Sequence, residues 1–226
     1  MSNNFLSSIS CFSFILLSLI LVRKTRNVTT PSLLNVHWAF IAFSIMKAIA
    51  IAVTLSMNVF PLGDTMVSPI LKVISEKFYD LSNLFLFHFG ISVLTCKTPL
   101  KINYKIFPLL LLVVYIIFNF MAIIDAETSR KVIRYGFGFT GSFLASIGFL
   151  NLYMIKTKSK GRKYFLSTMI CCTALLFYAV TEILNNSFWF FPVEFLRLLS
   201  ALALLSVPVY IVDLIGEDRN RRIGYV

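Results

Sequence analysis

The sequence predicts an all-α, polytopic membrane protein with seven transmembrane helices, and three observations lead to that prediction. Of the 226 residues, 58% are hydrophobic and 23 are Phe, and the mean hydropathy is +0.84. This is more apolar surface than a soluble domain of this size can bury. The apolar residues gather in stretches of about twenty, the length that crosses a bilayer, and basic residues cluster between them. We therefore expect one seven-helix domain over residues 1–226.

The expected spans are separated by short loops. They lie near residues 5–22, 34–59, 70–95, 106–124, 132–155, 164–185 and 192–215. No basic residue precedes the first span, whereas Arg23, Lys24 and Arg26 follow it directly. Because this is the reverse of a cleavable signal peptide, the first span is expected to be retained.

Charge predicts the orientation, because short loops rich in Lys and Arg stay in the cytoplasm. Such residues follow the first, third, fifth and seventh spans: Arg23, Lys24 and Arg26; Lys97, Lys101 and Lys105; Lys156, Lys158, Lys160, Arg162 and Lys163; Arg219, Arg221 and Arg222. The formal charge of +11 is thus explained by membrane orientation and not by nucleic-acid binding. We expect the amino terminus outside and the carboxyl terminus in the cytoplasm, across a bacterial or archaeal plasma membrane.

The second and third spans both carry polar side chains along one face. On the second span these are His37, Ser44, Lys47, Thr54 and Asn58, and on the third they are Glu76, Asp80 and Asn83, which share a face with Phe87 and Gly90. An ionisable group at the bilayer centre costs about 2.5–3.5 kcal/mol on translocon scales and suggests a functional site. Lys47 and Asp80 fall at similar depth, so an ion pair between them is predicted. That pair either fixes the registry of two helices or lines a cavity.

A second polar cluster is expected toward the outer surface. It comprises Glu182 and Asn185 at the end of the sixth span, Trp189 in the loop, and Glu194 and Arg197 at the start of the seventh. Glu194 and Arg197 are three residues apart, so they can pair along one helix face. With Glu76, these groups form either an outward-facing pocket or ordinary anchoring at headgroup depth.

The fifth and seventh spans contain residues that bear on helix packing. Gly136, Gly138 and Gly141 form the pattern G-x-G-x-x-G, but no strand precedes it, as a dinucleotide-binding turn requires. Gly138, Ser142 and Ser146 instead recur every four residues, as small residues do where membrane helices approach closely. In the seventh span, Pro208 is expected to bend the helix near Ser206.

The residues expected in membrane enzymes are missing. The last span has no lysine for a retinal Schiff base, and the only two histidines, His37 and His88, are too few for a three-histidine zinc hydrolase. No G-x-S-x-G, H-E-x-x-H or Walker motif occurs. We therefore predict a protein without catalytic activity, metal or cofactor, in which His88 is a hydrogen-bonded core residue.

Two segments, LSNLFLFHFGISVL at 81–94 and EFLRLLSALALLSVPVYIVDLIGEDRNRR at 194–222, are similar to the multi-helix membrane sensory regions of bacterial histidine kinases and diguanylate cyclases. In those regions the last membrane helix carries an Arg near its outer end and continues through a charged juncture into a cytoplasmic signalling helix. Arg197 and residues 217–222 match that layout. The resemblance implies a sensory module whose output lies in a further domain or a partner, and an open reading frame that continued past Val226 would favour it.

Three functions remain open at this stage. The first is a receptor or sensor that binds a small ligand or senses the bilayer through a pocket and shifts its third and seventh helices. The second is a small-solute or proton-coupled transporter that uses the Lys47–Asp80 pair. The third is a non-catalytic subunit whose loop 156–163 contacts a partner or anionic lipid. The candidate ligand-binding residues are Lys47, Glu76, Asp80, Asn83, Glu182, Glu194 and Arg197.

Overall fold

The computed structural model describes residues 2–28, 30–60, 67–96, 106–124, 126–156, 161–184 and 193–215, and the regular structure in these ranges is all helical. The elements are α1 (Ser2–Thr25), α2 (Pro31–Val59), α3 (Val67–Thr95), α4 (Ile106–Ile124), α5 (Ala126–Lys131), the π-helix η1 (Val132–Phe139), α6 (Thr140–Lys156), α7 (Gly161–Leu184), α8 (Val193–Leu204) and α9 (Val207–Ile215). Each stretch expected to span coincides with one helix or with two consecutive ones. The all-α prediction is therefore confirmed for the described residues.

Within the described ranges, five helical stretches are long and apolar enough to cross a membrane: Asn4–Thr25, Pro31–Val59, Val132–Lys156, Arg162–Leu184 and Val193–Ile215. The helix α3 is as long as α2, at 29 residues, but Lys72, Glu76, Lys77 and Asp80 lower its hydropathy. In α4 the apolar stretch is shorter, from Ile106 to Met121.

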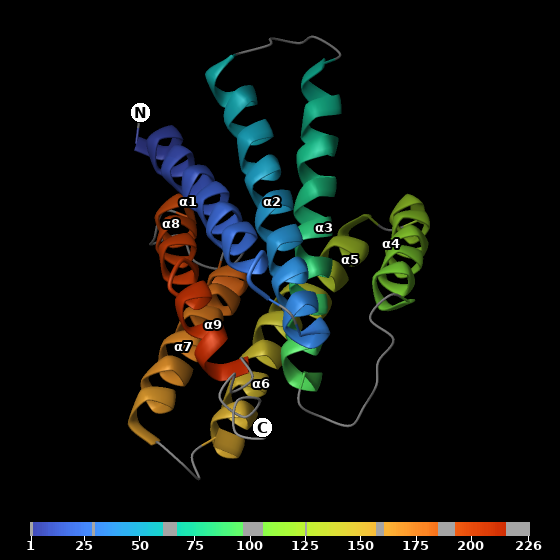
Figure 1. Cartoon of the computed structure of the whole chain (residues 1–226). Helices are drawn as coiled ribbons and strands as arrows, with labels where there is room; N and C mark the ends of the chain where they lie inside the picture. Colours follow the sequence, from blue (N-terminus) through green and yellow to red (C-terminus); the bar gives the residue numbers. More distant parts are fainter. Residues whose placement is uncertain are drawn as a thin grey trace.

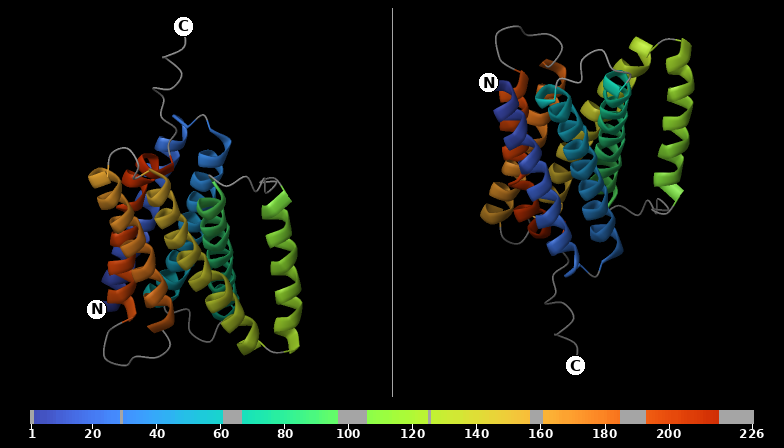
Figure 2. Two further views of the ribbon diagram at one scale, coloured as in Figure 1. Left: turned by 90° about the horizontal axis from the view of Figure 1, so that it is seen from below. Right: turned by 90° about the horizontal axis from the view of Figure 1, so that it is seen from above.

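The long helices lie side by side in an up-and-down bundle (Figures 1 and 2). The helix α3 packs between α2 and α6, α1 packs on α2 and α8, and α7 packs on α6, α8 and α9. In both views of Figure 2, α4 stands at the edge of the bundle, and the start of α1 and the end of α9 lie at opposite ends. The charged helix α3 is therefore central and the apolar helix α4 is peripheral.

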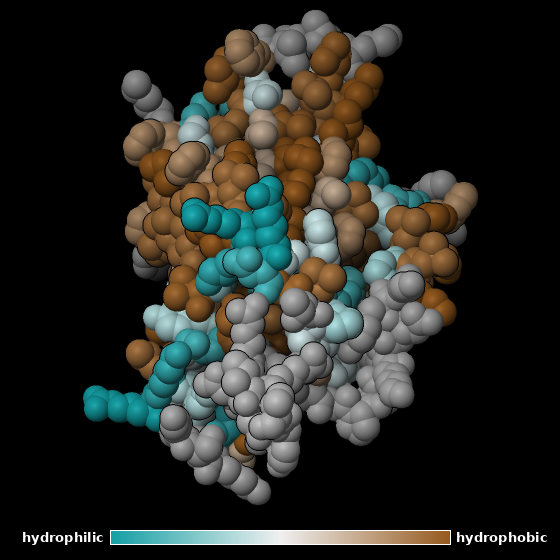
Figure 3. Space-filling view, viewed as in Figure 1, coloured by the Kyte–Doolittle hydropathy of each residue, from teal (hydrophilic) through white to brown (hydrophobic). Residues whose placement is uncertain are grey.

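Large apolar side chains cover the outside of the bundle, and Figure 3 shows hydrophilic residues in only a few patches of the face in view. Phe12 and Leu19 of α1 and Phe120 of α4 are all more than 60% exposed. Ser10 and Ser18 of α1 point inward instead, and their hydroxyls donate to the carbonyl oxygens four residues earlier. An apolar exterior around buried polar groups, many of them hydrogen-bonded within the bundle, indicates a membrane protein.

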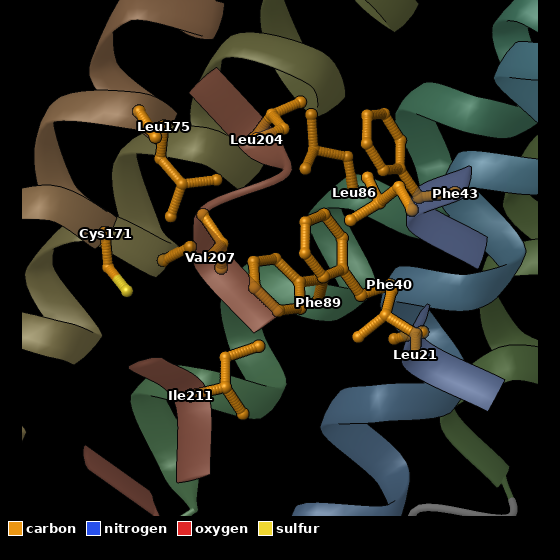
Figure 4. Packing of buried hydrophobic residues seen from close by; sticks show 14 of the residues in the cluster. Leu21, Phe40, Phe43, Leu86, Phe89, Cys171, Leu175, Leu204, Val207 and Ile211 are labelled. Atoms are coloured by element: carbon orange, nitrogen blue, oxygen red, sulfur yellow. The ribbon is translucent and has the colours of Figure 1, made fainter. Parts of the chain in front are cut away.

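Aromatic rings fill the core between α1, α2, α3 and α7, part of which is drawn in Figure 4. Phe40 stacks on Phe89 with ring centroids 4.4 Å apart. Phe43 meets Tyr178 edge to face at 5.5 Å and Phe14 in the same manner at 5.8 Å. These contacts join four helices through one cluster of buried side chains.

Glycines bring α3 and α6 into backbone contact. A Cβ atom on Gly90 would lie 2.2 Å from the carbonyl oxygen of Gly141, and one on Gly141 would lie 2.5 Å from the backbone nitrogen of Phe87. Two helical turns after Gly141, a Cβ atom on Gly148 would lie 2.8 Å from the backbone nitrogen of Leu94. The small residues of the fifth expected span therefore serve close helix packing, as the sequence predicted.

Two helices depart from a regular α-helix. The fifth expected span begins as the π-helix η1. At its end, the hydroxyl of Thr140, the first residue of α6, donates to the Tyr135 carbonyl oxygen at 3.2 Å. The last span is broken at Leu205 and Ser206, between α8 and α9. The break is where Pro208 was expected to bend the helix, because its ring nitrogen cannot donate to the preceding turn.

Candidate functional site

A buried ion pair joins α2 to α7 in the middle of the bundle. The Lys47 Nζ lies 3.0 Å from Oε1 of Glu182, and the two side chains are 1% and 6% exposed. The partner of Lys47 is therefore Glu182, and the predicted pair with Asp80 is wrong. The charge of Asp80 acts instead on Tyr115 of α4.

Tyr79 of α3 contacts both members of this pair. Its hydroxyl donates to Oε2 of Glu182, so both carboxylate oxygens accept a hydrogen bond. The Lys47 ammonium lies 3.5 Å from the centroid of the Tyr79 ring and 5.3 Å from that of Tyr178. A carboxylate and two aromatic faces thus replace the water that a buried ammonium loses.

Two arginines bring further positive charge to this pair. The guanidinium carbon of Arg134, in η1, lies 5.4 Å from the centroid of the Tyr79 ring. Arg134 and Arg197 of α8 are both close enough for their charges to act on Lys47. The Lys47–Glu182 pair thus lies at the meeting point of α2, α3, η1, α7 and α8.

The pair predicted between Glu194 and Arg197 is confirmed. Nη1 of Arg197 lies 2.8 Å from Oε1 and 2.9 Å from Oε2 of Glu194. The Ser7 hydroxyl of α1 donates to Oε2 of the same carboxylate at 2.5 Å. This links α8, the first half of the last helix, to the first helix. The Asn185 and Trp189 side chains, expected in the same cluster, lie outside the described residues.

The polar residues that the sequence predicts on one face of α3 are not part of the contacts around Lys47. Asp80 is 6% exposed, and its charge acts on Tyr115 of α4. Asn83 is fully buried with its amide against the backbone of Gly138, and neither amide atom has a hydrogen-bond partner among the described residues. Glu76 is half-buried farther along the helix.

The candidate residues therefore form two groups and not one. We call the first group the central charge cluster. It comprises Lys47, Glu182, Glu194 and Arg197, together with Tyr79, Tyr178 and Arg134. Asp80 and Asn83 instead lie on the faces of α3 turned toward α4 and η1, and Glu76 lies one turn before Asp80. Sequence reasoning missed Tyr79, Tyr178 and Arg134, although Tyr178 stands four residues before Glu182 and so shares its helix face.

The two histidines are both buried. His88 lies with its ring centroid 5.3 Å from that of Phe107 in α4. Neither ring nitrogen of His88 or His37 has a hydrogen-bond partner among the described residues. The prediction that His88 is a core residue is thus supported, but the hydrogen bond expected with it is not found in this part of the chain.

A second set of charges holds the opposite end of the last helix. The Lys24 Nζ donates to the Pro208 carbonyl oxygen at 2.5 Å, and the Lys156 Nζ donates to the Asp213 carbonyl oxygen at 2.8 Å. The Lys163 Nζ lies 2.9 Å from Oδ1 of Asp213. Three lysines from the ends of α1, α6 and α7 thus converge on α9. We call these contacts the α9 clamp.

Comparison of the chain with protein-family models, with curated proteins and with solved structures finds no match. Function must therefore be inferred from the geometry of the central charge cluster and the α9 clamp.

Proposed function

We propose that the chain is a multi-pass membrane receptor or sensor that passes a signal to the cytoplasm through its last helix. The observation that carries this proposal is that the two halves of the last helix are held by different charges. Arg197 and Glu194 hold α8 beside the central charge cluster, and Lys24, Lys156 and Lys163 hold α9. A change at the first set can thus alter the position of α9 relative to the second.

The proposal includes seven spanning helices, with the amino terminus outside and the carboxyl terminus in the cytoplasm. In addition to the five apolar stretches, α3 and α4 would cross. Two charged residues of α3 are compatible with a spanning helix because Asp80 is buried and Lys77 contacts Asn119 of α4, so these charges are turned away from lipid. The exposed Lys72 would lie near the outer end of the helix. The cluster of Lys24, Lys156 and Lys163 would face the cytoplasm.

The proposed mechanism is a shift between two packings of the bundle. A small ligand with hydrogen-bonding or charged groups would compete for the oxygens of Glu182 or Glu194. Loss of the Glu194 contact would release α8 from α1, and loss of the Glu182 contacts would loosen α2 and α3 from α7, on which α8 packs. Because α8 joins α9 through the break at Leu205 and Ser206, the change would reach the cytoplasmic side as a displacement of α9 within its clamp.

We expect Arg197→Ala to change the mobility of α9. The test is a spin label on Val212→Cys, which is 44% exposed, in a variant whose native cysteines are replaced, reconstituted in vesicles. Without Arg197, α8 loses its bond to Glu194, so the label should report a more mobile α9. Arg23→Ala, which removes an exposed charge from the end of α1, is the matched control and should leave the spectrum unchanged.

A second label on Leu112→Cys of α4, which is 48% exposed, separates coupling from general loosening. It should not respond to Arg197→Ala, because α4 does not contact α8. If neither Arg197→Ala nor Glu194→Gln alters the α9 label, or if both labels respond equally, the sensor proposal is wrong.

A proton-coupled or small-solute transporter is the second candidate, and the hydrogen-bonded Lys47–Glu182–Tyr79 group favours it. Its ionisable groups are buried at mid-bundle, as in relays that move a proton through a membrane. If this reading is right, proteoliposomes should show solute or proton flux that is abolished by Lys47→Met and retained by Lys163→Met, which removes an exposed lysine. Flux that is absent from the unaltered chain would exclude this candidate.

A further inference from the structure

An apolar groove lies between α7 and the broken last helix, away from the central charge cluster. It has a volume of about 340 Å³. It is lined by Met169, Ile170, Thr173, Ala174 and Phe177 of α7 and by Ala203 and Ser206 of the last helix. The groove lies where Ala174 and Ala203 present small side chains and where a two-residue turn separates α8 from α9.

The groove opens onto the outside of the bundle. Met169 at its edge is 48% exposed, and its neighbours Leu166 and Leu202 are 56% and 46% exposed. In a membrane these side chains face hydrocarbon. The groove is therefore accessible to lipid from the side, unlike the buried groups of the central charge cluster.

A basic residue lies on the same face of α7 as the groove. Arg162, Leu166, Met169, Thr173 and Phe177 follow one another at steps of four, three, four and four residues, which places them along one stripe of the helix. Arg162 is exposed, and next to it the Lys163 side chain is 71% exposed while it contacts Asp213. The apolar groove thus has a positively charged end.

The spacing along α7 places the groove deeper in the membrane than Arg162, at the depth of the acyl chains and as far as the bilayer midplane. Arg162 precedes Met169 by seven residues, or about 10 Å along the helix axis, and Phe177 by fifteen residues, or about 22 Å. The hydrocarbon of one leaflet is about 15 Å deep, half of the bilayer core. With its long side chain extended toward water, Arg162 reaches headgroup level while the groove lies at the depth of the acyl chains.

We propose that this face of α7 binds one anionic phospholipid of the surrounding bilayer, with the phosphate on Arg162 and an acyl chain in the groove. The guanidinium group suits a phosphate because it can donate two parallel hydrogen bonds. The headgroup charge is favoured by Arg162 and Lys163 together. This inference requires only that α7 crosses the membrane, and it stands apart from the sensor proposal.

The test is native mass spectrometry of the whole chain, released by mild detergent from vesicles of phosphatidylcholine mixed with an equal amount of phosphatidylglycerol. The unaltered chain should retain one phosphatidylglycerol in preference to phosphatidylcholine. Arg162→Gln should reduce that retained fraction about fivefold, the effect of one basic residue near an anionic surface. Thr173→Leu, which narrows the groove from its exposed side, should reduce retention of both lipids.

Two control variants distinguish a specific lipid site from general electrostatic attraction between the basic chain and anionic lipid. Arg23→Gln removes an exposed charge from the end of α1, and Ala52→Leu adds the same kind of bulk to an exposed position of α2. Both should retain lipid as the unaltered chain does. The proposal is overturned if Arg23→Gln weakens retention as much as Arg162→Gln, if phosphatidylcholine is retained equally well, or if Thr173→Leu has no effect.

Discussion

Replacing Lys47 with Met is expected to lower the free energy of unfolding by about 3–5 kcal/mol, the usual result of removing one partner from a buried ion pair. The variant leaves the Glu182 carboxylate buried with the Tyr79 hydroxyl but without the ammonium 3.0 Å away. Denaturant unfolding in detergent, followed by the helical circular dichroism signal, measures the change.

Two further variants show whether the loss comes from the unpaired charge. Lys47→Met combined with Glu182→Leu should recover most of the stability, because the buried charge is gone along with its partner. Lys163→Met is the matched control, since that lysine and Asp213 are 71% and 27% exposed, and it should cost less than about 1 kcal/mol. Equal losses for Lys47→Met and Lys163→Met would contradict a stabilising role for the central pair.

Gly141→Ala is expected to destabilise the bundle by about 1–3 kcal/mol, as overpacking usually does. The added Cβ would lie 2.5 Å from the nitrogen and 2.6 Å from the Cα of Phe87. These are backbone atoms of α3, so the clash cannot be relieved by a side-chain rotation. The helices α3 and α6 must move apart, and the unfolding measurement used for Lys47→Met records the cost.

Gly136→Ala is the control for this substitution. The nearest atom to its added Cβ is Cγ1 of Val132, at an ordinary contact distance of 3.6 Å. Because alanine is favoured over glycine within helices by about 0.5–1 kcal/mol, stability should be unchanged or slightly higher. If both variants behaved alike, the close approach of α3 and α6 at Gly141 would be wrong.

The positions of the helices followed from the sequence because apolar length and loop charge are local properties. The face of α3 that carries Asn83, Phe87 and Gly90 was also predicted to point inward, and it packs on η1 and α6: Phe87 meets Phe137 edge to face at 5.2 Å, and Gly90 contacts Gly141. The 3.6-residue period alone carries this information.

The partner of Lys47 could not be predicted in the same way. Counting residues gives the depth of a side chain along the bundle, but not the direction in which it points around the helix axis. Residue counting placed Asp80 at the depth of Lys47 and Glu182 nearer the outer surface, and it could not show that the packing of α7 on α2 brings Glu182 to Lys47. Tyr79 was missed for a related reason, since a tyrosine in an apolar stretch is normally counted among the hydrophobic residues.

The irregular backbone was predicted only in part. Proline has a known effect on a helix, so the interruption near Ser206 could be expected from Pro208. No comparable local signal marks η1, because a π-helix differs from an α-helix only in which carbonyl each N–H reaches. Arg134 lies within η1, and its place beside Tyr79 therefore could not be read from α-helical spacing.

The interruption at Leu205 and Ser206 has a mechanical consequence. A continuous helix behaves as a stiff rod, so twisting one end about the long axis turns the other end by a similar angle. Two short rods joined by a two-residue turn act more like rods on a ball-and-socket joint, which transmits little of the torsion. Movement that starts in α8 would therefore arrive in α9 mainly as tilt or translation.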